Sequence, residues 1–379
     1  MSLVELLIAT VPLMLIFATL FAFTTWLERK ALARIQNRIG PNKVGIPCTR
    51  IGLFGLGQPA ADGIKMIFKE NIVPRGADRL FHLLAPILAL IPSMLVLCFL
   101  PLDFPWLNED SVKAFLLDGA VIFFFAITGL NTLAVFMAGW ASRNKYSLLG
   151  GMRAVAQMVS YEIPLVLSAV IVVMMVGSLN AAEIAKAQTG WDWFVFSPWG
   201  FAAFVIFFIA ALAETNRSPF DLPEAESEII AGYFTEYSGF KFALFFLAEY
   251  IAMFAISGLA VTLFLGGGDG PGLTDAPWLS VMWFLAKIFA LIAVMIWLRG
   301  TLPRLRVDQL MGFAWKFMLP LSILNILVAG FAWHAQQQDS KTITVITWVI
   351  SLAILYGAAS GLNQLNRGKV RPREYKYAE

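Results

Sequence analysis

Carboxylates gather in one short stretch of this chain, between Glu214 and Glu228. The stretch holds five of the 25 acidic residues of the sequence, namely Glu214, Asp221, Glu224, Glu226 and Glu228. Carboxylates held close together repel one another, which raises their proton affinity and makes them titrate jointly. A cluster of this kind can exchange protons or respond to a nearby charge.

The acidic stretch also carries the signals of a helix start. Residues 221–224 have the spacing of a capping box, with proline in the first turn, and predict a helix that runs to Gly232. The carboxylates of Asp221, Glu224 and Glu228 would share one face of this helix. Glu226 would point away from them. The alternative interpretation is a solvated acidic loop, although the prolines and apolar residues at 219–223 favour packing.

Four ionisable residues interrupt apolar segments or their ends: Glu162, Glu214, Glu249 and Lys287. Glu162 and Glu249 would each lie ~10–15 Å below the predicted cytoplasmic surface. A charge at this depth is destabilising unless it is paired, hydrated or neutralised. Because two segments carry a carboxylate at a similar depth, we predict a polar passage that opens to the cytoplasm and carries protons or charge. The alternative is a set of structural ion pairs, such as Glu249 with Lys287.

The composition sets the class of protein. Of the 379 residues, 59% are hydrophobic and only 14% are charged, whereas soluble domains carry roughly 25% charge. Together with a mean hydropathy of +0.74, these values indicate an all-α polytopic membrane protein. Two distant cysteines, Cys48 and Cys98, exclude an iron–sulfur cluster held by this chain alone. Nucleic-acid binding is not expected, because the basic residues lie between apolar segments without a binding motif.

Nine apolar segments are long enough, or nearly so, to cross roughly 30 Å of hydrocarbon. They are about Leu3–Leu27, Phe81–Leu100, Ala114–Trp140, Ala154–Val176, Trp199–Ala213, Phe242–Leu265, Trp278–Leu298, Phe313–Trp333 and Ile343–Leu362. They form a single integral membrane domain over residues 1–379. Its cytoplasmic parts would be a first loop at 28–80, the acidic loop at 214–241, and a basic C-terminal tail. The last apolar segment and this tail together occupy 343–379.

Lysine and arginine are distributed very unevenly among the connections. If the first loop is cytoplasmic, 24 of them lie on the cytoplasmic side and only Lys113, Lys186 and Lys341 lie outside. This asymmetry predicts an outside N-terminus and a cytoplasmic C-terminus, which an odd number of spans satisfies.

The first cytoplasmic loop has its own pattern. Residues 38–42 predict a turn, and 58–70 predict a short helix with Pro59 in its first turn. Ile64, Ile67 and Phe68 would share one face, which is typical of an amphipathic helix at a membrane interface. A surface helix that only anchors the loop is the alternative.

Several long motifs carry a resemblance to a known family. They include Glu28-Arg29-Lys30, Arg38-Ile39-Gly40-Pro41-Asn42, Gln58-Pro59-Ala60-Ala61-Asp62, Phe68-Lys69-Glu70, Gly139-Trp140-Ala141-Ser142, Arg153-Ala154-Val155-Ala156-Gln157, Ser160-Tyr161-Glu162, Ala213 through Glu228, Phe246-Leu247-Ala248-Glu249-Tyr250, Pro303-Arg304-Leu305-Arg306 and Asp308-Gln309-Leu310. Across about Trp26 to Lys316 the chain closely resembles the H subunits of respiratory complex I, the proton-pumping NADH:quinone oxidoreductase.

The resemblance implies a role at the junction of the peripheral and membrane arms, where these subunits form the quinone entrance and chamber. The implied chamber residues are Glu28, Arg29, Arg38, Asp62, Lys69, Arg217, Phe220, Asp221, Glu224, Glu226 and Glu228. The implied start of the proton or charge relay is Glu214, Glu162 and Glu249, and Lys287 is added from its position in an apolar segment. Two departures from the family are a longer link at Gly45–Gly57 and Asn131, where some relatives carry a carboxylate.

The resemblance also implies the surroundings of the chain. It binds no cofactor itself; quinone, such as ubiquinone, is the substrate, and FMN, NADH and the iron–sulfur clusters belong to partners. Those partners are the terminal-cluster subunit, the 49 kDa-type subunit, and the small membrane subunits A, J and K. The location is the bacterial cytoplasmic (inner) membrane, or the mitochondrial inner membrane for an organellar chain. Alternatives are the homologous subunit of a membrane-bound hydrogenase or of an F420H2-type or plastid-type dehydrogenase and, beyond these, a secondary ion transporter or a passive scaffold.

Overall fold

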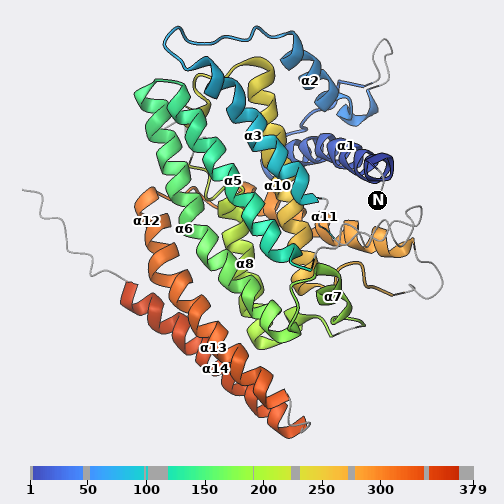
Figure 1. The fold of residues 1–379 in the computed structure, drawn as a ribbon, viewed down its shortest axis with the longest axis vertical. Coiled ribbons are helices and arrows are strands. Elements are labelled where there is room, and N and C mark those ends of the chain that lie inside the picture. The colour runs from blue at the N-terminus through green and yellow to red at the C-terminus, as the bar shows by residue number, and fades with distance from the viewer. Residues whose placement is uncertain are drawn as a thin grey trace, which may run out of the picture.

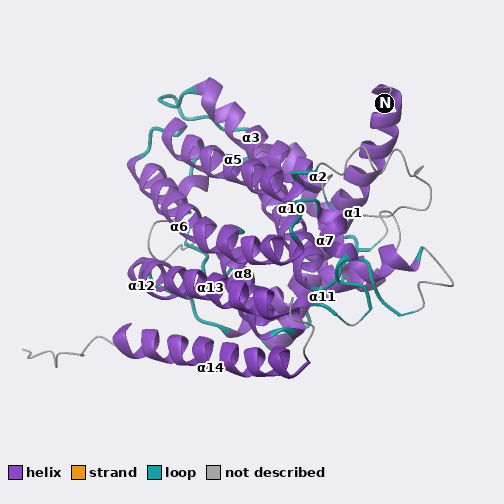
Figure 2. Ribbon diagram, turned by 60° about the horizontal axis from the view of Figure 1, so that its bottom comes forward, coloured by secondary structure: helices purple, strands orange, loops and turns teal. Residues whose placement is uncertain are grey.

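A computed structural model of the chain describes residues 3–45, 52–97, 100, 118–190, 192–222, 231–271, 278–336 and 341–366. Within these ranges the secondary structure is helical throughout (Figures 1 and 2). The long helices are α1 (Leu3–Ile35), α3 (Arg79–Leu97), α5 (Ala120–Ala141), α6 (Lys145–Val176), α8 (Pro198–Glu214), α10 (Gly239–Phe264), α11 (Leu279–Thr301), α13 (Leu319–Gln336) and α14 (Lys341–Asn366). The prediction of an all-α membrane protein is confirmed.

Each of the nine predicted apolar segments overlaps one of these helices, although the bounds differ by several residues in places. Among the described residues, six spans are long and apolar enough to cross a membrane, and two shorter apolar helices lie at Pro198–Glu214 and Ile346–Leu362. The fifth segment begins at Pro198 because Ser197 caps it, its hydroxyl accepting the Gly200 N–H at 3.2 Å. The number of crossings and their orientation stay predictions.

Helix α10 lies at the centre of the bundle (Figure 1). In its apolar window 72% of the residues are buried, against 33–44% in the other five spans. It packs against α3, α8 and α11, while α6 packs against α5, α8 and α13. An apolar helix that is buried all round is the element around which such a bundle assembles.

The connection between α1 and α3, which is predicted to be cytoplasmic, contains the predicted short helix, α2 (Gln58–Phe68), with proline in its first turn. Its apolar side chains are largely exposed: Ile64 57%, Ile67 63% and Phe68 84%. This is the arrangement expected of a helix whose apolar face meets lipid or a partner.

Helix α12 (Val307–Phe313) continues through a π-helical turn, Ala314–Met318, into α13. Helix α14 packs on α13 along one edge of the bundle (Figure 2). The helix predicted from Asp221 lies, beyond Leu222, outside the described residues, as do Glu224, Glu226 and Glu228.

Candidate functional site

The segment that follows α8 is buried although it has no regular secondary structure. Every residue from Thr215 to Leu222 is buried. Gln157 of α6 holds this segment in place. Its side-chain amide donates to the carbonyls of Ala213 at 2.8 Å and Phe220 at 2.7 Å. Backbone groups that leave a helix inside a protein need such partners, so Gln157 fixes the path of the segment.

Arg217 lies at the centre of a buried polar cluster. Its Nη1 is 3.6 Å from Oε2 of Glu28, and its guanidinium lies 4.0 Å from the ring centre of Tyr250. Tyr250 in turn donates its hydroxyl to Glu28 at 2.7 Å, and Arg299 forms an ion pair with the same carboxylate. Glu28 of α1 is therefore tied to α10, to α11 and to the buried segment after α8.

Burial by itself would lower the pKa of Arg217, but the neighbouring groups outweigh it. Tyr250, Glu28 and Glu249 together raise the pKa of the guanidinium. Arg217 therefore stays charged, and its charge acts on carboxylates of two different helices.

The second predicted chamber group, Asp221, is also buried and paired. Arg304 Nη2 donates to its carboxylate at 3.0 Å, and the backbone N–H of Leu305 donates to the Pro219 carbonyl at 3.2 Å. Phe220 packs its ring against Tyr161 of α6, with 5.3 Å between ring centres. The segment after α8 is thus pinned between α6 and the connection that follows α11.

Arg29 and Asp62 form an ion pair between α1 and α2. Gln58 supports it by donating to Asp62 at 3.0 Å. Arg38 and Lys69 are exposed and lie outside this contact. Of the predicted chamber residues, the structure therefore brings Glu28 together with Arg217, and Arg29 with Asp62, in two separate groups.

The three relay carboxylates lie around the same region. Glu214, at the end of α8, is buried, and its Oε2 has no hydrogen-bond partner among the described residues. Glu162 of α6 is half-buried and is the charged group that acts on Glu214. Glu249 of α10 accepts a hydrogen bond from Tyr233 at 3.2 Å. The structure thus relates Glu249 to Arg217 and Glu214 to Glu162.

The residues next to Glu162 are held by α12 and by the π-helical turn that follows it. Trp315 Nε1 donates to Ser160 Oγ at 3.2 Å, and the Tyr161 hydroxyl donates to the Leu310 carbonyl at 2.9 Å. These two bonds connect α6 to the first part of the α12–α13 span.

Lys287 lies far from Glu249, so the alternative interpretation of an ion pair between these two residues is wrong. Its Nζ donates to the carbonyls of Leu265, Gly267 and Asp269 at 2.6, 3.0 and 2.7 Å. These carbonyls lie beyond the far end of α10, and Leu265 is ~24 Å along that helix from Glu249. The geometry shows Lys287 capping a helix end; its part in the relay stays a prediction.

Sequence reasoning missed the partners of the predicted residues, namely Gln157, Tyr233, Tyr250, Arg299 and Arg304. A polar residue in an apolar segment was the available signal for Gln157 and Tyr250. Within the described residues, His, Cys, Asp and Glu form no group of three or more that could hold a metal ion.

The fold and the site define a helical membrane protein in which buried carboxylates are paired with arginines, one of which, Arg217, is itself buried. Residues 8–330 match the model of the NADH dehydrogenase family. The chain is 48% identical over 320 residues to the H subunit of NADH-quinone oxidoreductase from Geobacillus kaustophilus, a match that covers 83% of this chain and 91% of that one. It is 47% identical to the corresponding H subunit from Dehalococcoides mccartyi, covering 88% of this chain and 87% of that one. It is also 47% identical to the H subunit from Thermomicrobium roseum, a match that covers 82% of this chain and 91% of that one. This chain belongs to the NADH dehydrogenase family, as a relative of the H subunits of NADH-quinone oxidoreductase.

Proposed function

We propose that this chain forms the membrane end of a quinone chamber in a proton-pumping NADH:quinone oxidoreductase. We further propose that it couples quinone reduction to proton translocation through its buried carboxylates. Family membership supports the first part. The observation that carries the second is the buried charge of Arg217, which acts on Glu28 and on Glu249 at once. A group shared in this way transmits a change of charge at one carboxylate to the other.

On this proposal the chamber lies against the segment that follows α8 and against the first cytoplasmic loop. Its lining would consist of Glu28, Arg29, Arg38, Asp62, Lys69, Arg217, Phe220 and Asp221, with Glu224, Glu226 and Glu228 of the acidic stretch. Two guanidinium nitrogens of Arg217, Nε and Nη2, are buried without a partner among the described residues. Buried donors need acceptors, and a quinone carbonyl is one such acceptor.

The chemical step would consume two electrons, supplied by an iron–sulfur cluster of a partner subunit, and two protons. A change of charge next to Asp221 and Arg217 would alter the proton occupancy of the nearby carboxylates. Glu249, through Arg217, and Glu214 with Glu162 would then pass the change into the membrane. The buried Oε2 of Glu214 supports this role, because no hydrogen bond from the described residues occupies it.

The same proposal assigns the other subunits of complex I as partners and a bacterial cytoplasmic membrane as the location. The electron donor of the assembly is identified by the subunits that co-purify with this chain. A hydrogenase large-subunit relative in their place would move the assignment to a membrane-bound hydrogenase.

The carboxylates Glu162 and Glu249 provide the direct test. In the assembled complex, Glu162→Gln and Glu249→Gln should each lower quinone reductase activity and proton pumping, because the amide cannot exchange a proton. Glu183→Gln, an exposed carboxylate of the short helix α7 (Ala181–Lys186), is the matched control and should change neither. Turnover and pumping in inside-out vesicles are the measurements. Fully assembled variants with wild-type turnover and pumping would refute the relay.

A further inference from the structure

A histidine is buried near the start of α3, where the connection from α2 enters the bundle. His82 is fully buried, and its ring stacks on that of Tyr237 with 4.1 Å between ring centres and 7° between ring planes. Its Nδ1 lies 3.1 Å from the Nζ of Lys241 in α10. None of these three residues belongs to the candidate site described above.

The contact with Lys241 identifies the protonation state of the His82 ring. A lysine ammonium has three donors and no acceptor, so Nδ1 accepts from it and carries no proton itself. The ring is therefore neutral in this arrangement. A second proton on the ring would remove the acceptor and place two positive charges 3.1 Å apart.

The groups around the ring include one anion as well as this cation. Glu236 is the second charged group that acts on His82, and its carboxylate accepts from Asn144 at 2.8 Å. Helix α5, which packs on α3, contains no ionisable residue. On the side of α3 itself, Asp78 and Arg79 lie one turn before His82 and are exposed. The charge of the ring therefore decides whether it attracts the cation or the anion less strongly.

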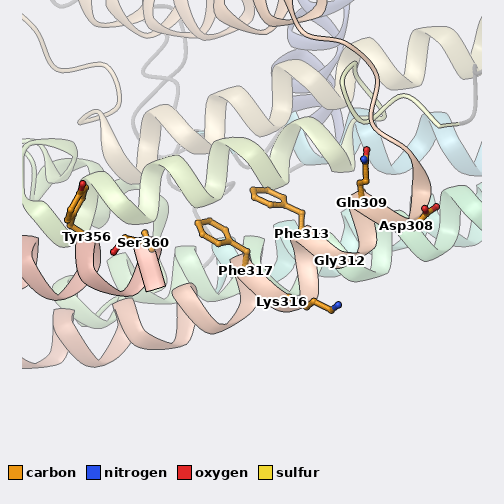
Figure 3. Close-up of a pocket in the computed structure, with 9 residues that line it drawn as sticks. Asp308, Gln309, Gly312, Phe313, Lys316, Phe317, Tyr356 and Ser360 are labelled. Carbon is orange, nitrogen blue, oxygen red and sulfur yellow. The ribbon is translucent and has the colours of Figure 1, made fainter. Parts of the chain in front are cut away.

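The ring is enclosed by side chains and does not line the cavity that the bundle contains elsewhere. That cavity, of about 690 Å³, lies between α12 with its π-helical turn and α14, and its walls include Phe313, Phe317 and Tyr356 (Figure 3). Its lining residues include neither His82 nor Lys241. Protonation, rather than the binding of a larger ligand, is thus the change that an enclosed ring of this kind undergoes.

The segment 232–238, which carries Tyr237, connects the His82 contact to the candidate site. The Tyr237 ring packs edge-on against Phe245 at 5.0 Å between ring centres, and Tyr233 packs against the same ring at 5.8 Å. Tyr233 in turn donates to Glu249 at 3.2 Å. A movement of Tyr237 would therefore be transmitted to the residue that orients Glu249.

The connection from α2 is held against the start of α10 by backbone groups as well. Ser238 Oγ donates to the Glu70 carbonyl at 3.1 Å. A Cβ added at Gly239 would lie only 3.0 Å from the carbonyl oxygen of Lys69, a proposed chamber residue. The bond between His82 and Lys241 closes the other end of this same contact.

We propose that His82 is a pH-sensitive positioning residue, whose neutral ring holds Lys241 and the segment 232–238 in place and whose protonation releases them. The inference rests on the function proposed above for Glu249. An ordinary histidine is half protonated at about pH 6.5, so the contact is present above this pH and is lost as the pH falls through it. Acid would thus loosen the segment that carries Tyr233 and slow the relay.

The pH profile of quinone reductase turnover in the assembled complex tests the proposal. Between pH 8 and pH 6 the neutral fraction of an ordinary histidine falls about fourfold, so this contact should lower wild-type turnover by up to that factor. His82→Asn keeps an acceptor for Lys241 but cannot become charged, and Lys241→Gln keeps a donor without its charge. Both variants should retain the turnover that the wild type loses at pH 6. His334→Gln is the matched control, because His334 is the other histidine of the chain and is exposed in the last turn of α13, and it should keep the wild-type profile.

Hydrogen exchange of the same complexes gives a readout that does not depend on the relay. After correction for the intrinsic effect of pH, amides within 232–245 should exchange several-fold faster at pH 6 than at pH 8 in the wild type, but not in His82→Asn. Equal protection at both pH values in the wild type, or a wild-type acid loss of turnover in His82→Asn, would overturn the inference. If His82→Asn does not assemble, Lys241→Gln gives the same comparison. A failure of the proposed function would show separately, as wild-type turnover in Glu249→Gln with the exchange difference intact.

Discussion

Arg217 is the residue on which the buried charges of this protein converge. It is 6% exposed, lies against the Tyr250 ring and is within ion-pair distance of Glu28. A buried charge is tolerated only where other groups compensate it, and here carboxylates on α1 and α10 do so. The same arrangement makes Arg217 sensitive to any change of charge at either carboxylate.

Substitution of Arg217 should therefore have graded effects. Arg217→Gln leaves the buried carboxylates under-compensated and should destabilise the chain by about 3–5 kcal/mol, which lowers the amount of assembled complex. Arg217→Lys keeps the charge but loses the flat contact with Tyr250, so assembly should persist while turnover falls. Native gels and quinone reductase assays measure the two effects. If Arg217→Gln assembles and turns over like the wild type, the charge of Arg217 is not needed for function.

Gln157 is predicted to matter for structure more than for chemistry. Its amide donates to the carbonyls of Ala213 and Phe220, each of which also accepts a backbone N–H, so Gln157→Ala removes two buried hydrogen bonds. Each lost hydrogen bond is worth about 0.5–1.5 kcal/mol. Thermal unfolding of the purified complex should begin at a lower temperature, and Gln157→Glu should be at least as harmful because a carboxylate cannot donate. A stable, fully active Gln157→Ala variant would contradict this assignment.

At this scale the sequence was informative about which residues are unusual and uninformative about their partners. Glu162, Glu214 and Glu249 are identifiable because charge is rare in apolar segments. The partners of the predicted residues lie elsewhere in the sequence: 16 residues separate Glu249 from Tyr233, and 222 separate Glu28 from Tyr250. Sequence spacing within one helix carries no information on such contacts, which is why the sequence could not exclude the alternative pair of Glu249 with Lys287.

At the scale of elements, α6 and the turn at Gly232–Phe234 are joined by an unusually close backbone contact. A Cβ added at Gly150 would lie 2.5 Å from the Cα of Gly232. The turn also carries Tyr233, which donates to Glu249. Glycine at position 150 therefore lets α6 approach the element that orients a relay carboxylate.

Gly150→Ala should push this turn away from α6. We expect lower stability and lower quinone reductase turnover, because the backbone atoms of Gly232 cannot move aside cheaply. Gly330→Ala is the matched control: it lies in α13, has nothing within 4 Å of its added Cβ, and should be neutral or slightly stabilising. Melting temperature and turnover of the two variants give the comparison. Equal behaviour would show that the contact at Gly150 is not limiting.

The helices themselves were largely predictable, because hydropathy and length are enough to locate an apolar helix. The short helix α2 was predicted from Pro59 and its amphipathic pattern. The π-helical turn at Ala314–Met318 was not, since an extra residue in a helical turn leaves no mark in composition or periodicity. Its position follows from tertiary contacts such as Trp315 with Ser160.

At the scale of the whole molecule, the charge pairs made by the adjacent residues Glu28 and Arg29 form an inner and an outer group. Glu28 and Arg217 are buried among α1, α10 and the segment after α8, whereas Arg29 and Asp62 join α1 to α2 at the surface. Adjacent residues of α1 thus serve the two groups, because Glu28 faces the bundle and Arg29 faces α2. A substrate that enters between α1 and α2 would meet the outer pair first.

Arg29→Ala tests this order. The outer pair is half-exposed, and such pairs contribute only about 0–1 kcal/mol, so stability and assembly should hardly change. If Arg29 guides quinone into the chamber, its loss should instead raise the apparent KM for quinone several-fold and leave kcat nearly unchanged. Arg34→Ala, an exposed arginine in the last turn of α1, is the control and should leave KM unaltered. The reverse result, reduced assembly with an unaltered KM, would show that the Arg29–Asp62 pair only stabilises the contact between α1 and α2. The quinone entrance would then lie elsewhere.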